Sequence, residues 1–170
     1  MGPERARAEL RRLLDGISTS MVTTMGSDGL LHARPMLLAR FEETGQLVFL
    51  THLSSTKRDD IDRDARVNAT FVSDKGDRYV SISGHAAVAH DTSRMRDLWH
   101  PTYRAWFPNG PEDRDGAIFT VSIAYADYWK TPTSHMVRIW DALKAITMGR
   151  VVESGTRGQV RLKPDTGQSG

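Results

Sequence analysis

A short run of hydroxyl side chains followed by a lysine is the part of this sequence best suited to hold an anion. Ser55 and Thr56 directly precede Lys57, and the pattern after them predicts a helix that begins here. A helix N-terminus presents unpaired backbone N–H groups and the positive end of the helix dipole, so it favours a phosphate group. Arg34 would add a second cation if its strand lay beside the strand that leads into this helix. A purely structural alternative is a capping box formed by Thr56 and Asp59, with solvated basic side chains around it.

Two predicted strands must position these groups. Residues 31–41 alternate in character, as a strand does, and a polar turn containing Gly45 connects them to an apolar strand at 46–51. We expect the second strand to be buried on both faces. Pro35 has no N–H to donate to a sheet, so we expect an edge position or a bulge there. The alternation places one set of side chains on a common face of the first strand: His32, Arg34, Met36, Leu38 and Arg40.

The rest of the sequence predicts further hairpins with helices around them. The strands follow one another instead of alternating with helices, which argues against a Rossmann sheet. We therefore expect a mainly β, α+β fold: a six-stranded antiparallel barrel with peripheral helices, forming one domain over residues 1–150 and followed by a polar tail at 151–170. The other expected strands are 18–25, 67–73, 79–89 and 117–129, with at most a short one at 159–162; the expected helices are 3–15, 55–66, a stretch from 91 divided at Pro101, and 136–148.

Composition excludes several classes of function. With 39% apolar and 26% charged residues among 170, the chain has the composition of a soluble globular protein. No apolar run approaches the ~20 residues of a membrane span, and no apolar signal segment is present, so we expect a cytoplasmic protein. The absence of cysteine excludes disulfides and thiolate ligands. The excess of basic residues lies at the two ends, which argues against nucleic-acid binding. The six histidines lack metal-binding spacing, and scattered surface positions are the simpler interpretation.

Several short motifs, taken in order, resemble those of the pyridoxamine 5'-phosphate oxidase-like split-barrel family, and in particular its general stress protein branch. The resemblance extends over about residues 15–150. It implies an FMN-binding type of split barrel and a homodimer whose cofactor site is shared between the subunits. The motifs are RPMLL at 34–38, FLT at 49–51, STK at 55–57, YVSISGHA at 79–86, the aromatic stretch 98–111, and ADYW at 126–129.

The resemblance assigns candidate FMN-binding positions but no catalytic residue. The phosphate clamp would comprise Arg34, Ser55, Thr56 and Lys57. The ring would lie against Pro35, Met36, Leu37 and Thr51, with aromatic residues of the other subunit near it; the candidates for that role are Trp106 and Trp129.

The reaction stays open at this point. Members that oxidise vitamin B6 carry an Arg-Leu-His-Asp-Arg-like segment near the C-terminus, and residues 136–141 here read MVRIWD, so that reaction is not implied. One hypothesis is a flavin-dependent oxidoreductase of the general stress protein type that acts on a small substrate, with NAD(P)H as a candidate electron donor. Another is a flavin-binding stress protein without turnover, and a third is a barrel that uses deazaflavin or haem. A homodimer would also cover the aromatic surface between Trp99 and Trp140, because one small barrel cannot easily bury it.

Overall fold

The computed structural model describes residues 3–75, 77–130 and 156–161, so the helix expected at 136–148 lies outside the described residues. None of the helices in this part of the chain is both long and apolar enough to cross a membrane. The elements are α1 (Pro3–Leu14), β1 (Thr19–Met25), β2 (Leu31–Phe41), β3 (Gln46–His52), α2 (Thr56–Arg63), β4 (Arg66–Val72), β5 (Arg78–Ala89), α3 (Thr92–Leu98), the 3-10 helices η1 (Pro101–Ala105) and η2 (Gly110–Glu112), β6 (Gly116–Lys130) and β7 (Thr156–Arg161).

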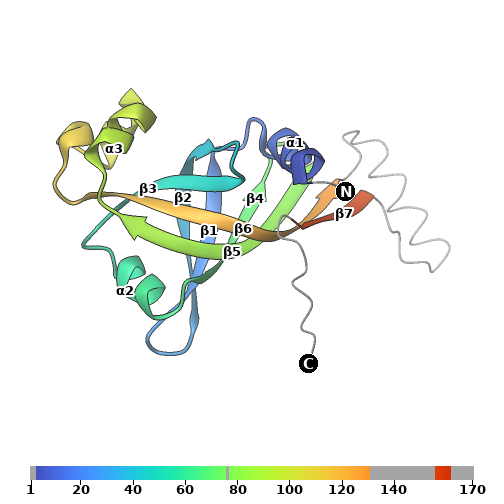
Figure 1. Cartoon of the computed structure of the whole chain (residues 1–170), viewed down its shortest axis with the longest axis horizontal. Coiled ribbons are helices and arrows are strands. Elements are labelled where there is room, and N and C mark those ends of the chain that lie inside the picture. The colour runs from blue at the N-terminus through green and yellow to red at the C-terminus, as the bar shows by residue number, and fades with distance from the viewer. Residues whose placement is uncertain (1–2, 76, 131–155, 162–170) are drawn as a thin grey trace.

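Six antiparallel strands close into a barrel, as the sequence predicted (Figure 1). Their order is β3-β2-β1-β4-β5-β6, and pairing between β3 and β6 completes the ring. The long strand β6 pairs with β5 along one edge, while its other edge is divided between β3 and β7. β7 adds a seventh strand to the sheet and begins at Thr156, earlier than the short strand expected at 159–162.

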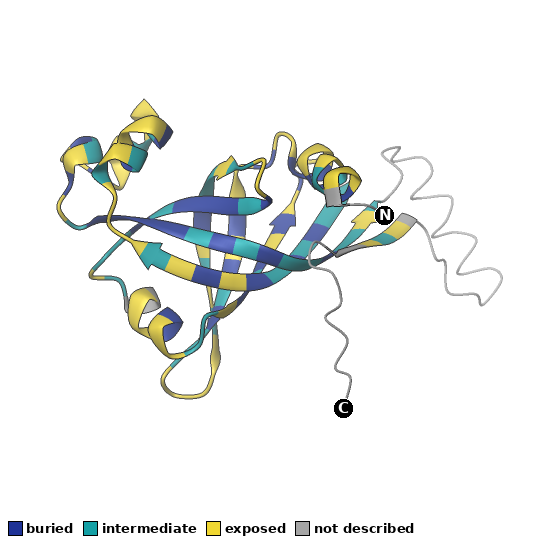
Figure 2. Ribbon diagram, viewed as in Figure 1, coloured by how far each residue is buried: buried dark blue, intermediate teal, exposed yellow. Residues whose placement is uncertain are grey.

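The barrel is filled by the inward residues of each strand, and a second apolar cluster lies outside it. Phe49 and Phe119 meet edge to face inside the barrel, with ring centroids 6.0 Å apart. The adjacent Val48 faces the opposite way, toward the second cluster, which also contains Met95 of α3 and Phe107. β3 is therefore buried on both faces, as expected, and Figure 2 shows its ribbon dark blue over most of its length.

The barrel is incompletely closed between β2 and β3. These strands pair only where Leu38, Arg40 and Phe41 face β3, and in the described pairings the first seven residues of β2 contact β1 alone. Pro35 lies in that unpaired stretch, which confirms the predicted edge position. A register shift between Leu38 and Arg40 makes Ala39 an extra residue, a bulge.

The bulge corrects one expectation. We placed Arg40 on the same face as Met36 and Leu38, but Arg40 lies opposite Val48 on the outer side of the barrel. There its guanidinium donates to the carbonyl oxygen of Asp97, 3.1 Å away. An inserted residue reverses the alternation beyond it, and a strict period of two cannot anticipate it.

Helix boundaries follow the sequence signals closely. α2 begins at Thr56, close to the predicted start, and ends at Arg63, three residues before the predicted end. Pro101 separates α3 from η1, as a proline without a backbone donor should.

Candidate functional site

A cavity of about 470 Å³ opens where β2 and β3 separate. Because the first part of β2 lacks a partner on this side, the space that a paired strand would fill is left open. Five of the ten residues predicted from the sequence line it: Pro35, Met36, Leu37, Thr51 and Trp106. The other lining residues are Thr19, Leu50, His52, Tyr103 and Phe107.

Three elements form the cavity walls, and most of their surface is apolar. β2 contributes Pro35–Leu37, and β3 contributes the residues around Thr51 from the opposite side. The aromatic segment at η1 supplies the third wall through Tyr103, Trp106 and Phe107. Phe107 is buried in the second apolar cluster, whereas Trp106 is 54% exposed. Apolar walls with an exposed indole among them suit a flat ring system.

The aromatic stretch 98–111 divides into a packed part and an exposed part. Trp99 packs edge to face against Tyr103 and Phe107, with centroid distances of 6.0 and 6.4 Å. Phe107 is buried, whereas Trp99 and Tyr103 are half-buried against the second apolar cluster. Trp106 and Trp129 are the exposed tryptophans among the described residues.

His52 is the polar cavity residue that sequence reasoning missed. Its imidazole stacks on Phe107, with ring centroids 4.5 Å apart and planes 27° from parallel. Nδ1 lies 3.3 Å from Oδ2 of Asp115. We interpreted the histidines as scattered surface residues; the side chain of His52 is 39% exposed, and it also lines the cavity. A usable signal was present, since His52 directly follows Thr51 in the FLT motif. The described residues contain no group of three His, Asp or Glu side chains arranged to hold a metal ion.

Asp115 also fixes the turn between β3 and α2. The amide of Ser54 donates to its carboxylate at 2.8 Å and the Ser54 hydroxyl at 2.6 Å, while the amide of Leu53 donates to its backbone carbonyl. Hydrogen bonds from the hydroxyl and amide of Ser54 hold the pKa of the Asp115 carboxyl below its usual value. The hydroxyl of Ser54 is thus engaged with Asp115.

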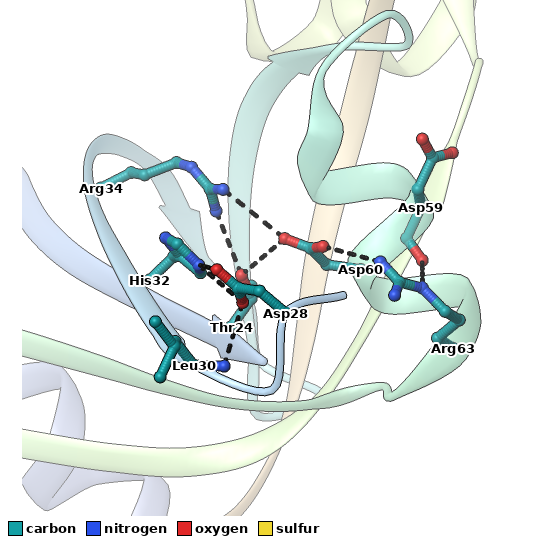
Figure 3. Close-up of polar contacts among 8 residues, drawn as sticks. All are labelled: Thr24, Asp28, Leu30, His32, Arg34, Asp59, Asp60 and Arg63. Carbon is teal, nitrogen blue, oxygen red and sulfur yellow. Dashed lines mark hydrogen bonds and ion pairs between the residues drawn. The ribbon is translucent and has the colours of Figure 1, made fainter. Parts of the chain in front are cut away.

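Arg34 reaches from β2 to α2 through a network around Asp60 (Figure 3). One guanidinium nitrogen donates to the Thr24 hydroxyl at 3.1 Å, and the other lies 3.5 Å from the Asp60 carboxylate. Asp60 is buried, and it also accepts from Thr24 at 3.2 Å and from Arg63 at 3.1 Å. A buried carboxylate needs such partners to offset the cost of desolvation.

Arg34 was expected to add a second cation if its strand lay beside the strand that leads into the helix, and the structure meets this condition. β2 lies beside β3, and Arg34 contacts the helix that β3 leads into. Its charge is partly balanced by Asp60, which the sequence did not indicate. The backbone of α2 begins at Thr56 as expected, whereas the side chains of Thr56 and Lys57 lie outside what the structure describes.

Trp129 lies apart from the cavity of its own chain. It stands on the last part of β6, where the guanidinium of Arg157 from β7 lies 5.5 Å from the centre of its ring. The structure therefore brings Trp106 together with the predicted β2 and β3 residues but separates Trp129 from them within one chain.

Sequence comparison finds a matching family model and a related fungal protein. The sequence model of the family described as "Pyridoxamine 5'-phosphate oxidase like" matches residues 5–153. Protein bli-3 of Neurospora crassa is 30% identical in an alignment of 141 positions that covers 77% of this chain and 68% of that protein.

Two solved structures share this architecture. The general stress FMN/FAD binding protein of Xanthomonas citri superimposes with a TM-score of 0.66 at 26% identity, covering 76% of this chain and 92% of that one. A heme binding protein of Mycobacterium smegmatis gives a TM-score of 0.56 at 13% identity, covering 74% and 52%. The second likeness shows the fold alone.

Proposed function

The chain belongs to the pyridoxamine 5'-phosphate oxidase-like family, and from that membership we propose that it binds FMN in the cavity between β2 and β3. The observation that carries the proposal is the apolar cavity at the unpaired edge of β2, which five of the predicted ring-binding residues line. The similarity to an FMN/FAD binding stress protein from Xanthomonas citri supports the same ligand class.

The residues present fit this cofactor. The cavity of about 470 Å³ falls within the ~300–1,000 Å³ of typical ligand sites. Its apolar walls suit the isoalloxazine faces, and Thr51 and His52 supply polar groups for the ring edge. When bound, FMN would supply two-electron chemistry.

We assign the phosphate to the start of α2. There Ser55, Thr56 and Lys57 would offer donors at the positive end of the helix, and Arg34 would add charge from β2. Pro35, Met36, Leu37 and Thr51 would hold the ring, with Trp106 against one of its faces. Trp129 would reach a cofactor only from a second subunit.

We extend the proposal to a homodimer in which each site is completed by both chains. Its support is the exposed apolar surface of the described residues, which includes Met21, Leu31, Trp106 and Trp129. A monomer leaves these side chains in water, and pairing about a two-fold axis would cover them. Light scattering on the FMN-loaded protein should give twice the chain mass of 19.0 kDa. A species of single chain mass that keeps its flavin would contradict the shared site.

For the reaction, we propose a cytoplasmic flavin-dependent oxidoreductase acting on a small substrate, with NAD(P)H as candidate electron donor. The alternative is a stress protein that binds flavin without turnover. Consumption of NADPH by the FMN-loaded protein under air separates them, because a protein without turnover leaves NADPH unchanged.

A haem or deazaflavin in the same cavity is the second candidate. The observation that favours haem is His52 on the cavity wall, because imidazole is a common axial ligand of haem iron. The visible spectrum of the purified protein distinguishes the three, since flavin, deazaflavin and haem absorb differently.

A bulky substitution inside the cavity tests whether FMN binds there. Leu37→Trp places an indole in the cavity and should weaken FMN binding at least tenfold in a fluorescence titration. Ala33→Trp is the matched control, since Ala33 lies on the same strand, is exposed and does not line the cavity. Equal FMN affinity in both variants would place the flavin elsewhere.

A further inference from the structure

His52 is the residue of the cavity wall best suited to exchange a proton near neutral pH. Of the ten lining residues, His52 and Tyr103 carry titratable side chains. Burial raises the pKa of the Tyr103 phenol, so that group stays protonated at neutral pH. Imidazole is the side chain that ordinarily changes charge between about pH 5 and 8.

Two contacts fix the orientation of the His52 ring. Stacking on Phe107 at 4.5 Å sets its plane, and Phe107 is itself buried in the second apolar cluster. The carboxylate of Asp115, 3.3 Å from Nδ1, sets its rotation within that plane. A carboxylate can only accept a hydrogen bond, so we assign the proton of the neutral ring to Nδ1. In the neutral ring Nε2 is then the proton acceptor.

Hydrogen bonds hold Asp115 in place, so that it can orient the His52 ring. It receives both hydrogen bonds from Ser54, and its own amide donates to Asp113 at 2.9 Å. Asp113 is in turn held by the side-chain amide of Asn109 at 3.2 Å. Asp115 therefore connects the cavity wall with the turn that leads into α2.

We propose that His52 is the proton-transferring residue of this cavity and that Asp115 is its positioning residue. The inference rests on FMN binding as proposed above. Bound FMN would supply two-electron chemistry, and its reduced form would carry an additional negative charge beside His52. Nε2 of His52 takes a proton from solvent at the same time, and the resulting imidazolium, paired with Asp115, balances that charge.

The same proton then defines a class of substrate. A small carbonyl, imine or quinone-type acceptor would receive hydride from the reduced ring and the proton from Nε2. The Nε2–H bond breaks and an O–H or N–H bond forms, so the acceptor gains two electrons and two hydrogens while His52 returns to its neutral form. The oxidised flavin is regenerated in this step.

Other titratable groups near His52 must be separated from it in any test. Tyr103 shares the cavity, and Asp113 and Asp115 lie on the segment that precedes β6. His90 interacts through Nδ1 with the carbonyl of Gly116, the residue that pairs with His52, at 2.7 Å. His85 is exposed on β5, is not among the cavity-lining residues, and provides the matched control.

The test is the midpoint potential of bound FMN measured against pH. Above neutral pH the potential of the wild-type protein should fall more steeply with rising pH than that of free FMN, because reduction also protonates His52. His52→Gln should lose this feature, and His85→Gln should keep it. A His52→Gln curve as steep as the wild-type curve would overturn the proposal, even though FMN is bound. Failure of the wild-type protein to bind FMN would instead overturn the proposed function and this inference together.

A second measurement needs no flavin. Long-range ¹⁵N spectra of the imidazole in the apo protein should show the Nδ1–H tautomer, and Asp115→Asn should convert it to a mixture of tautomers. An Nε2–H tautomer in the wild-type protein would overturn the assignment of Nε2 as acceptor, whatever the protein binds.

Discussion

The seam between β5 and β6 and the seam between β2 and β3 belong to one barrel, yet they are built in opposite ways. β5 and β6 are paired at twelve positions, and their single irregularity, between Ser83 and Gly84, does not interrupt the contact. β2 and β3 share three paired positions, next to a proline-containing edge and a bulge. The first seam is closed along its whole length, whereas the second opens into a cavity lined by apolar side chains.

Residue size and donor count explain the difference. Gly84 faces inward, and a Cβ there would lie 2.3 Å from the carbonyl oxygen of Ser122, so only glycine permits this approach of the two strands. On the other seam, Pro35 lacks a donor and Ala39 shifts the register. The small residue on β5 permits close pairing with β6, which stabilises that seam. The interrupted pairing between β2 and β3 instead gives a ligand access.

Adding a side chain where β5 and β6 pair closely should have the largest effect on stability. Gly84→Val forces a side chain against the Ser122 carbonyl and should lower the free energy of unfolding by about 3 kcal/mol, as overpacked sites do. Ala87→Val lies on the same strand with its side chain exposed and should change stability by less than about 0.5 kcal/mol. Urea denaturation of both variants measures the difference. Equal stability would mean that β5 and β6 do not approach as closely as described.

On the open seam, the effect should appear in binding. Arg34→Gln should weaken FMN binding by about 1.5–3 kcal/mol, the range for a hydrogen bond to a charged group. Riboflavin lacks the phosphate and should be affected much less, and Lys57→Ala should show the same selectivity. Arg40→Gln is the control on the same strand, because Arg40 lies outside the cavity beside Asp97. Isothermal titration calorimetry with FMN and riboflavin measures the loss of binding free energy for each ligand. Equal losses would show that Arg34 does not bind phosphate.

The aromatic wall of the open seam should contribute less. Trp106→Ala removes an exposed indole from the cavity and should cost about 1 kcal/mol, roughly a fivefold loss of FMN affinity. Trp129→Ala distinguishes two forms of the site. An unchanged affinity assigns the ring contacts to one chain, while a similar loss indicates that a second subunit contributes Trp129. Fluorescence quenching measures both variants, and a Trp106→Ala protein with wild-type affinity would remove this residue from the site.

The smallest effect is local and depends on pH. The pKa of Asp115 is lowered in the folded protein, so its contribution is present above the usual carboxyl value and is lost as pH falls through the lowered pKa. The amide of Ser54 should therefore exchange faster in acid than the intrinsic pH dependence requires. In Asp115→Asn this acid-dependent increase should disappear. Amide exchange measured by NMR tests it, and identical pH dependence in both proteins would contradict the role given to Asp115.

Local patterns predicted much of this molecule, and tertiary contacts determined the rest. The edge position of Pro35, the division at Pro101 and the two buried faces of β3 each follow from a property of the residues concerned. The bulge at Ala39 could not be predicted, because its residue is compatible with a regular strand. The cavity role of His52 depends on Phe107 and Asp115, which are more than fifty residues away in the sequence. Arg34 likewise depends on a tertiary contact, with Asp60 on the helix that follows β3.

The central claim is that the gap between β2 and β3 holds FMN, and methyl NMR tests it most directly. Addition of FMN should shift the methyl signals of Met36, Leu37 and Leu50, which line the cavity, and leave those of Val80 and Ile82 in the barrel interior unchanged. Shifts confined to residues outside the cavity, or no shift at saturating FMN, would contradict the account.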